Sequence, residues 1–228
     1  MPPQPIVALD VPSLADARAL VEKLDARADF YKVGLQLFTA EGPRVVEWLH
    51  GEGKRVFLDL KLHDIPSTVN KAAASAMRMK VALLTIHGIG GEAMVRAAVD
   101  GAGKETGVLV VTVLTSMDAA AASAALGHPV ASVREEVLRL AAVAAAAGAH
   151  GIVCAGSECA AVRAEYGARL KALVPGLRTA AVGGDDQARV VTPEEAAAAG
   201  AGYVIVGRAV TGAEDPRAAF DGVVARLA

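Results

Sequence analysis

Charged side chains interrupt an otherwise apolar stretch at residues 57–66, and their spacing suggests chemistry. Alternate side chains of a strand point to opposite faces, so Asp59 and Lys61 share one face while three leucines share the other. Burying an unpaired charge costs several kcal/mol, roughly, so such groups pair, reach solvent at the strand end or take part in a reaction. Asp64 follows where Pro66 ends the strand. The Lys61 ammonium is therefore bracketed by two carboxylates, an arrangement able to hold or move a proton.

The elements that must position these groups alternate along the whole chain. Short apolar runs, typical of buried parallel strands, are expected at residues 5–10, 30–34, 55–62, 81–87, 108–115, 150–155, 171–175 and 203–206. Helices are expected at residues 13–26, 39–51, 67–79, 91–101, 157–166 and 192–200, with two more that start at residues 132 and 215. Residues 116–130 are expected to form a loop.

The regular repeat predicts the fold. Eight strand–helix units in 228 residues leave about 28 residues for each, close to the roughly 30 residues of a βαβ unit. We therefore expect a single-domain (β/α)8 TIM barrel that spans residues 1–228. A doubly wound open sheet would need a glycine-rich turn after the first strand, and residues 10–13 do not provide one. In a barrel, functional groups lie at the carboxyl ends of the strands.

Polar groups are found at most of these expected strand ends. They are Asp10, Lys32, Asp59, Lys61, Asp64, His87, Thr115, Arg178, Gly207 and Arg208. Asp10 or Lys32 alone could form a structural ion pair. Four alternating charges at one rim, two lysines and two aspartates, instead favour a functional site. His63 and His87 are better explained as structural, hydrogen-bonded histidines.

A phosphate site is expected after the eighth strand. There Gly207 can offer a backbone N–H group and Arg208 a cation, although Arg208 could instead form a surface salt bridge. Arg178 and Gln187 flank a glycine-rich segment at residues 182–186. This segment is either a lid that closes over the phosphate or an ordinary solvated loop.

The composition excludes several classes of partner. A net charge of −2, a pI near 6.2 and an aromatic content of 4% give no basis for binding nucleic acid or anionic lipid. No apolar run reaches the roughly 18 residues that a membrane span needs. The first residues lack signal-peptide features, and Cys154 and Cys159 fit no common zinc or redox spacing. We therefore expect a cytoplasmic protein that acts on a small molecule, and no cluster of His, Asp or Glu has a spacing typical of metal ligands.

The segments above resemble orotidine 5′-phosphate decarboxylases of the bacterial type. Residues 57–68 are similar to the family's signature segment almost without interruption. Shorter similarities follow in the same order at residues 6–10, 32–34, 113–117, 175–178, 186–189 and 206–208. The departures are Val174, Ile89 and the alanine-rich segment after Met117. These departures bear on the dynamics of the loops rather than on the chemistry.

The resemblance implies a cofactor-free and metal-free reaction, the decarboxylation of orotidine 5′-monophosphate to uridine 5′-monophosphate in de novo pyrimidine biosynthesis. It implies that Lys61 protonates C6 and that Asp59 lies against the substrate carboxylate. Lys32 is expected to hold Asp59 and a ribose hydroxyl in place. Asp10 is expected to bind the ribose, and Thr115 the pyrimidine.

The resemblance also implies a phosphate-binding site and a homodimer with shared active sites. The phosphate-binding residues would be Arg178, Gln187, Gly207 and Arg208. Asp64 and Thr68 would reach into the neighbouring subunit's site. Two alternatives stay open: a Mg²⁺-dependent sugar-phosphate decarboxylase or synthase of the same superfamily, and a non-catalytic phosphate-binding barrel.

Overall fold

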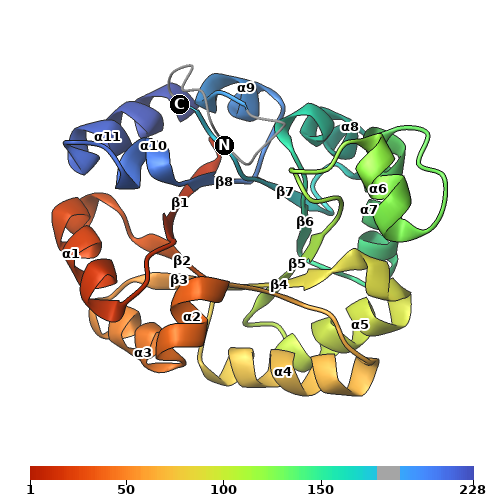
Figure 1. Cartoon of the computed structure of the whole chain (residues 1–228), viewed down its shortest axis with the longest axis horizontal. Coiled ribbons are helices and arrows are strands. Elements are labelled where there is room, and N and C mark those ends of the chain that lie inside the picture. The colour runs from red at the N-terminus through yellow and green to blue at the C-terminus, as the bar shows by residue number, and fades with distance from the viewer. Residues whose placement is uncertain (179–190) are drawn as a thin grey trace.

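The computed structural model describes residues 1–178 and 191–228. Within these residues, eight parallel strands form one closed barrel in which each strand pairs with the next and β8 pairs with β1 (Figure 1). The strands are β1 (Gln4–Leu9), β2 (Phe30–Gly34), β3 (Arg55–Leu62), β4 (Leu83–His87), β5 (Gly107–Val111), β6 (Gly151–Val153), β7 (Lys171–Val174) and β8 (Tyr203–Val206). The predicted (β/α)8 barrel is confirmed.

Helices surround the barrel (Figure 1). They are α1 (Leu14–Leu24), α2 (Leu35–Glu41), α3 (Arg44–Gly51), α4 (Pro66–Arg78), α5 (Gly91–Ala102), α6 (Ala119–Leu126), α7 (Val133–Ala146), α8 (Gly156–Tyr166), α9 (Pro193–Ala198), α10 (Arg208–Thr211) and α11 (Pro216–Leu227), with short 3₁₀ helices η1 (Asp25–Arg27) and η2 (Gly88–Gly90). The expected starts of α1, α7 and α9 are confirmed. At each, the side chain of Ser13, Ser132 or Thr192 accepts a hydrogen bond from the first turn of the helix.

Two helical regions differ from the expectation. The helix expected at residues 39–51 is divided into α2 and α3, because Gly42 has a φ of 62° and ends α2 in a conformation that side-chain-bearing residues rarely adopt. The loop expected at residues 116–130 contains α6. Asp118 caps this helix by accepting a 2.8 Å hydrogen bond from the Ala121 N–H, and the alanine run that follows favours helix.

Strand β5 ends earlier than expected. It was expected to reach residue 115 but ends at Val111, which pairs with Val153, the last residue of β6. The Thr112 N–H still donates to the Val153 carbonyl at 3.3 Å, and β6 offers no further strand residue beyond that point. Thr115 therefore lies in the connection that follows β5 rather than at the end of a strand.

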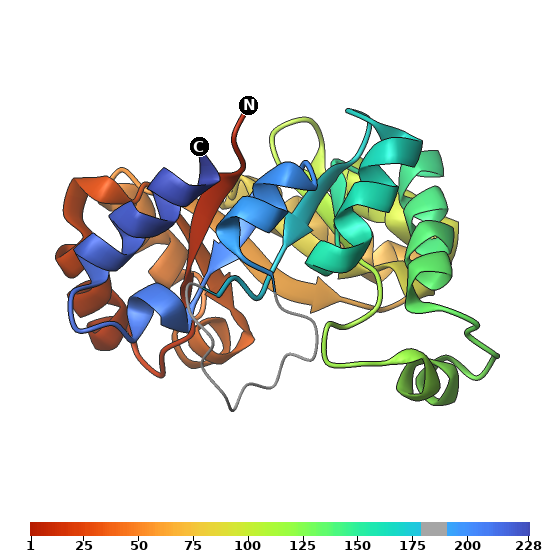
Figure 2. The ribbon, with the colours of Figure 1, turned by 90° about the horizontal axis from the view of Figure 1, so that it is seen from above.

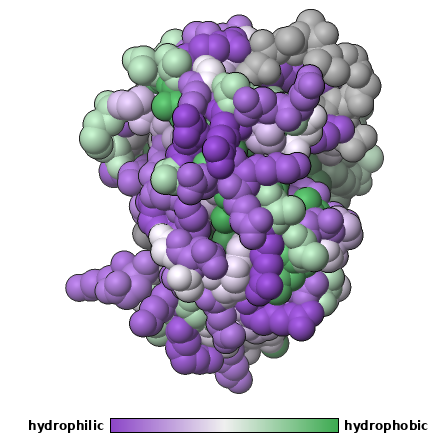
Figure 3. Space-filling view, turned by 90° about the vertical axis from the view of Figure 1, so that its left-hand side faces the viewer, coloured by the Kyte–Doolittle hydropathy of each residue, from purple (hydrophilic) through white to green (hydrophobic). Residues whose placement is uncertain are grey.

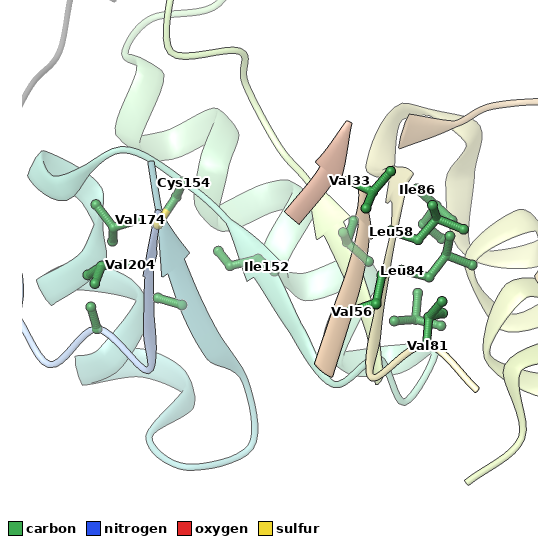
Figure 4. Packing of buried hydrophobic residues seen from close by; sticks show 14 of the residues in the cluster. Val33, Val56, Leu58, Val81, Leu84, Ile86, Ile152, Cys154, Val174 and Val204 are labelled. Atoms are coloured by element: carbon green, nitrogen blue, oxygen red, sulfur yellow. The ribbon is translucent and has the colours of Figure 1, made fainter. Parts of the chain in front are cut away.

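Apolar side chains pack on both faces of the barrel wall, as expected for parallel strands. The outer cluster lies between strands and helices, and Figure 4 shows Leu58 and Leu84 of neighbouring strands within it. The inner cluster fills the barrel and consists of Ile6, Ala8, Phe30, Phe57, Leu83, Leu109, Leu173, Tyr203 and Ile205. The barrel is thus a packed core, which confines chemistry to its ends.

A second ribbon view and a space-filling view show how the molecule is arranged around this core (Figures 2 and 3). The chain's N-terminus lies on one side of the barrel, and α6 projects on the opposite side (Figure 2). Hydrophilic residues predominate on the face formed by α1, α3 and α11, with small apolar patches between them (Figure 3). None of the helices that the structure describes is long and apolar enough to cross a membrane.

Candidate active site

Strand β3 carries the two-faced pattern that its sequence predicts. Leu58 is fully buried in the outer cluster, and Leu60 and Leu62 pack against that cluster. Asp59 and Lys61 occupy the alternate positions and meet each other, with the Lys61 Nζ donating to Asp59 Oδ1 at 2.8 Å. The Asp59 side chain is 12% exposed and that of Lys61 31%. The carboxylate is therefore enclosed, while the ammonium opens toward the rim.

Ion pairs join three neighbouring strands at this rim. The Lys32 ammonium on β2 lies 3.6 Å from Asp59 Oδ2 and donates to Asp10 Oδ1, just beyond β1, at 2.7 Å. Asp10, Lys32, Asp59 and Lys61 thus form one chain of alternating charges. Gly34 provides room for it, because a Cβ there would lie 3.0 Å from both the Asp10 carboxylate and the Lys32 ammonium.

The electrostatics of Asp59 keep its carboxylate ionised. Burial on its own raises the pKa of the Asp59 carboxyl. The opposite effect is larger and comes from the ammonium groups of Lys32 and Lys61 and from the Thr85 hydrogen bond, so the pKa lies below its ordinary value. A fixed negative charge is thereby held beside the partly open Lys61 ammonium. This pairing can repel an incoming anionic group while keeping a proton donor close to it.

Lys61 has an unusual backbone conformation. Its φ is 50°, a left-handed value that costs a residue with a side chain about 1–2 kcal/mol. The register between β3 and β4 shifts at the same place, between Leu58 and Leu62. Backbone strain of this kind gathers at functional sites, where the surrounding structure must hold it.

Thr85 on β4 is a site residue that sequence reasoning missed. It is fully buried, its hydroxyl accepts from the Lys61 backbone N–H at 2.9 Å, and the same hydroxyl donates to Asp59 Oδ1 at 2.8 Å. The available signal was a polar residue at an inward position of an apolar strand, two residues before His87. That signal is weak, because threonine is also common in ordinary strands.

Two histidines border the cluster. The rings of His63 and His87 meet edge to face with centroids 6.0 Å apart. Burial, followed by the neighbouring His63 and Lys61, lowers the pKa of His87 below its ordinary value, although Asp59 acts in the opposite direction. Their expected structural role stays a prediction.

The remaining predicted residues lie around the same end of the barrel. Asp64 and Thr68 follow β3 and are exposed. Among the described residues, no ion pair joins Asp64 to Lys61, and one Asp64 oxygen accepts from the Ile65 N–H at 2.6 Å. Thr115 is half-buried after β5. Within the described part of one chain, then, Asp64 is not ion-paired with the row of charges on β1 to β3.

The candidate phosphate residues come from β7 and β8, which complete the ring beside β1. Arg178 follows β7, and its N–H donates to the Val191 carbonyl at 3.0 Å. Gly207 directly follows β8, and a Cβ placed on it would meet no atom of residues 1–178 or 191–228 within 4 Å, so these residues leave space beside its backbone. Arg208 begins α10 and is exposed. Gln187 and the glycine-rich segment at 182–186 lie outside the described residues.

The described residues offer no cluster of typical metal ligands. Across residues 1–178 and 191–228, no group of three or more histidine, cysteine, aspartate or glutamate side chains is placed to hold a metal ion. The charged groups at the rim are instead the ammonium groups of Lys32 and Lys61 and the carboxylates of Asp10 and Asp59.

Comparison with known proteins gives a consistent result. The sequence model of the orotidine 5′-phosphate decarboxylase / HUMPS family matches residues 3–223. The orotidine 5′-phosphate decarboxylase of Anaeromyxobacter dehalogenans is 51% identical over 222 residues, which cover 96% of each chain. That of Halorhodospira halophila is 45% identical over 232 residues, which cover 100% of this chain and 97% of the relative.

A solved structure supports the same assignment. The crystal structure of orotidine 5′-phosphate decarboxylase from Lactobacillus acidophilus superposes with a TM-score of 0.87 at 31% identity, covering 100% of this chain and 99% of that one. The resemblance inferred from the motifs is confirmed. The chain belongs to the orotidine 5′-phosphate decarboxylase family.

Proposed function

We propose that this enzyme decarboxylates orotidine 5′-monophosphate to uridine 5′-monophosphate in de novo pyrimidine biosynthesis, with Lys61 as the proton donor. The observation that carries the proposal is the row of alternating charges from Asp10 to Lys61 at the carboxyl end of the barrel. Full-length relatives named for this activity support it.

The chemistry needs a cation beside C6. When the bond between C6 and the carboxylate breaks, the electron pair stays on C6 in an orbital in the ring plane, where the π system cannot delocalise it. The Lys61 ammonium would stabilise this charge and then transfer a proton from Nζ to C6, leaving an amine that regains a proton from solvent. Asp59, held ionised, would crowd the substrate carboxylate and disfavour the ground state.

Lys32 and Asp10, the members of the row that come from β2 and from the end of β1, would bind the sugar. Lys32 lies between Asp10 and Asp59 with its side chain 9% exposed, so it can orient Asp59 while one donor faces a ribose hydroxyl. The Asp10 side chain is 62% exposed and can accept from the ribose. Thr115 would contact the pyrimidine from the connection after β5.

The phosphate would bind at the ends of β7 and β8. The open space beside the Gly207 backbone supports this placement, and the cations of Arg178 and Arg208 come from the same two strand ends. Gln187 would add a polar contact. Binding energy from this remote group can be used to lower the barrier at C6.

We also propose a homodimer with shared active sites. Exposed apolar side chains follow three neighbouring strands at this end of the barrel: Leu35 is 54% exposed, Ile65 65% and Ile89 45%. Apolar surface gathered in this way is typical of a protein interface. Asp64 and Thr68 are exposed on the same side and would complete the partner's site.

We further propose that residues 1–228 act as one decarboxylase domain in the cytoplasm. Pairing of β1 with β8 joins the two ends of the chain in one barrel and supports the single domain. Cys154 and Cys159 are buried and, within the described residues, form no disulfide, which suits a reducing compartment.

Loss of orotidylate ultraviolet absorbance tests the proposed function. The purified enzyme, dialysed extensively against a strong chelator, should convert orotidylate with unchanged kcat/KM, because an ammonium rather than a metal stabilises the charge. A sugar phosphate with Mg²⁺ serves as the competing substrate. Turnover of the sugar phosphate alone, restored by Mg²⁺ after dialysis, would favour the sugar-phosphate alternative. Absence of any turnover would favour the non-catalytic barrel.

A further inference from the structure

Strand β3 contains more residues than its neighbour can pair with. Leu58 pairs with Leu84 and Leu62 with Ile86, so the residues between them on β3 face a single residue, Thr85, on β4. The strand must bulge here, and a bulge leaves backbone groups without their regular partners. The bulge contains Lys61, with its left-handed φ of 50°.

The Thr85 hydroxyl takes the place of the missing backbone partner. It accepts from the Lys61 N–H at 2.9 Å and donates its own proton to Asp59 Oδ1 at 2.8 Å. The Lys61 Nζ donates to the same oxygen at 2.8 Å. These three contacts close a ring that starts at the backbone of Lys61 and returns through its own side chain.

We propose that Thr85 is a positioning residue for the decarboxylation, because its hydroxyl fixes both the bulged backbone of Lys61 and the carboxylate that aims the Lys61 ammonium. This inference rests on the proposed role of Lys61. The hydroxyl is enclosed and contacts Lys61 and Asp59, and it acts on the reaction through these two residues. Its complete burial means that no water can replace it without repacking.

Valine matches threonine in shape but lacks the hydroxyl, so Thr85→Val removes both contacts and leaves the packing. A misplacement of about 1 Å at a reacting group can cost about 10²-fold, and we expect kcat to fall by about that factor while KM changes little. Thr85→Ser keeps the hydroxyl and should stay close to wild type. Thr85→Cys, with a thiol that donates and accepts weakly, should fall between them.

Thr106→Val is the matched control. Thr106 is also buried, at 3% exposure, and its hydroxyl donates to the Val81 carbonyl at 2.8 Å near the opposite end of the barrel. Both valine variants lose a buried hydrogen bond and should unfold at lower temperature. Only Thr85→Val should lose kcat. The acid limb of its kcat/KM profile should also move to higher pH, since the Thr85 hydrogen bond helps to lower the pKa of Asp59.

Three results would overturn the inference: wild-type kcat in Thr85→Val, an equal loss in Thr106→Val, or Thr85→Ser no better than Thr85→Val. If Thr85→Val does not fold, the ratio of kcat between Thr85→Ser and Thr85→Cys decides, with equality as the contrary result. A crystal structure of the Thr85→Cys or Thr85→Val variant tests the inference without turnover. A longer distance between Lys61 Nζ and Asp59 supports it, and an unchanged 2.8 Å contact contradicts it even if the proposed substrate is wrong.

Discussion

The two ends of the barrel interior hold their polar groups in opposite ways. At the carboxyl end, Lys32 and Lys61 converge on the buried Asp59. At the amino end, a histidine and a lysine share one neutral partner, Tyr203. His150 Nε2 lies 2.9 Å from the Tyr203 hydroxyl, and Lys171 lies 5.4 Å from the centre of the same ring. The inner apolar cluster separates the two ends.

The polar contacts at the amino end stabilise the fold, whereas the charges at the carboxyl end serve the reaction. Contacts between cations and aromatic rings at the amino end satisfy the polar groups and close the barrel at little cost. Two cations beside one enclosed carboxylate are a poor way to stabilise a fold, because desolvation offsets much of the attraction. Such an arrangement persists where a reaction uses it. Changes at the carboxyl end should therefore alter activity, and changes at the amino end should alter stability.

The largest effect is expected from Lys61→Ala. Losing the proton donor and the stabilising charge together should lower kcat by more than the roughly 10²–10⁴-fold typical of a general acid alone. Loss of orotidylate absorbance measures it, with Lys171→Ala at the amino end as the matched lysine control, expected to keep its activity. A Lys61→Ala variant that retains over about a tenth of wild-type kcat would refute the assigned role.

A smaller but substantial effect is expected from Arg208→Ala. Arg208 is assigned to the phosphate and not to C6. If phosphate binding lowers the barrier at C6, the activation free energy that governs kcat/KM should nevertheless rise by roughly several kcal/mol in this variant. With a truncated substrate that lacks the phosphate, added phosphite dianion should activate the wild type more than the variant. Equal activation of both would contradict the assignment.

Subunit mixing tests whether Asp64 acts across the interface. Lys61→Ala and Asp64→Ala should each be inactive, and after dissociation and random reassociation about half of the dimers are hybrids. Each hybrid would have one intact site and one that lacks both residues, so activity should return to about a quarter of wild type. No recovery, with tagged subunits shown to exchange, would place Asp64 in its own subunit's site.

The smallest effect concerns stability at the amino end. Burial and then the nearby Lys171 lower the pKa of His150 below its ordinary value of 6.5. The unfolded chain therefore takes up this proton more readily than the folded protein, and stability should fall as the pH drops through about 6.5 toward the folded-state pKa. Urea unfolding should show a weaker decline for His150→Gln over that window. An identical decline in the wild type and the variant would argue against protonation of His150 as the cause of the lost stability.

The overall architecture was predictable because its signals are periodic. The apolar runs and capping residues repeat along the chain, and the two-faced pattern around Asp59 and Lys61 follows from the alternation of a strand. The helix expected at 39–51 was wrongly taken as continuous, because Gly42 divides it, and the expected end of the fifth strand was wrong, because the length of β6 sets it. Boundaries of this kind depend on neighbouring elements, which a local pattern does not contain.

The candidate site was predictable only in part. Charged residues in an apolar strand are visible in sequence, and so Lys32, Asp59 and Lys61 could be named before their contacts were known. The contribution of Thr85 depends on a register shift between β3 and β4 and on the left-handed backbone of Lys61. Neither can be inferred from residue types. Lysine does not favour a left-handed backbone, and the register depends on how two strands pair.

Replacing and rebuilding the Lys61 ammonium tests the central claim most directly. Lys61→Cys should be inactive, and alkylation with 2-bromoethylamine then restores a side chain of nearly the same length that ends in an ammonium. Cys154 and Cys159 are fully buried, so position 61 should react selectively, and Lys171→Cys treated in the same way is the control. Activity on orotidylate should rise by at least about 100-fold, the lower range for a general acid. No rise, despite a single modification confirmed by mass, would contradict Lys61 as the group that protonates C6.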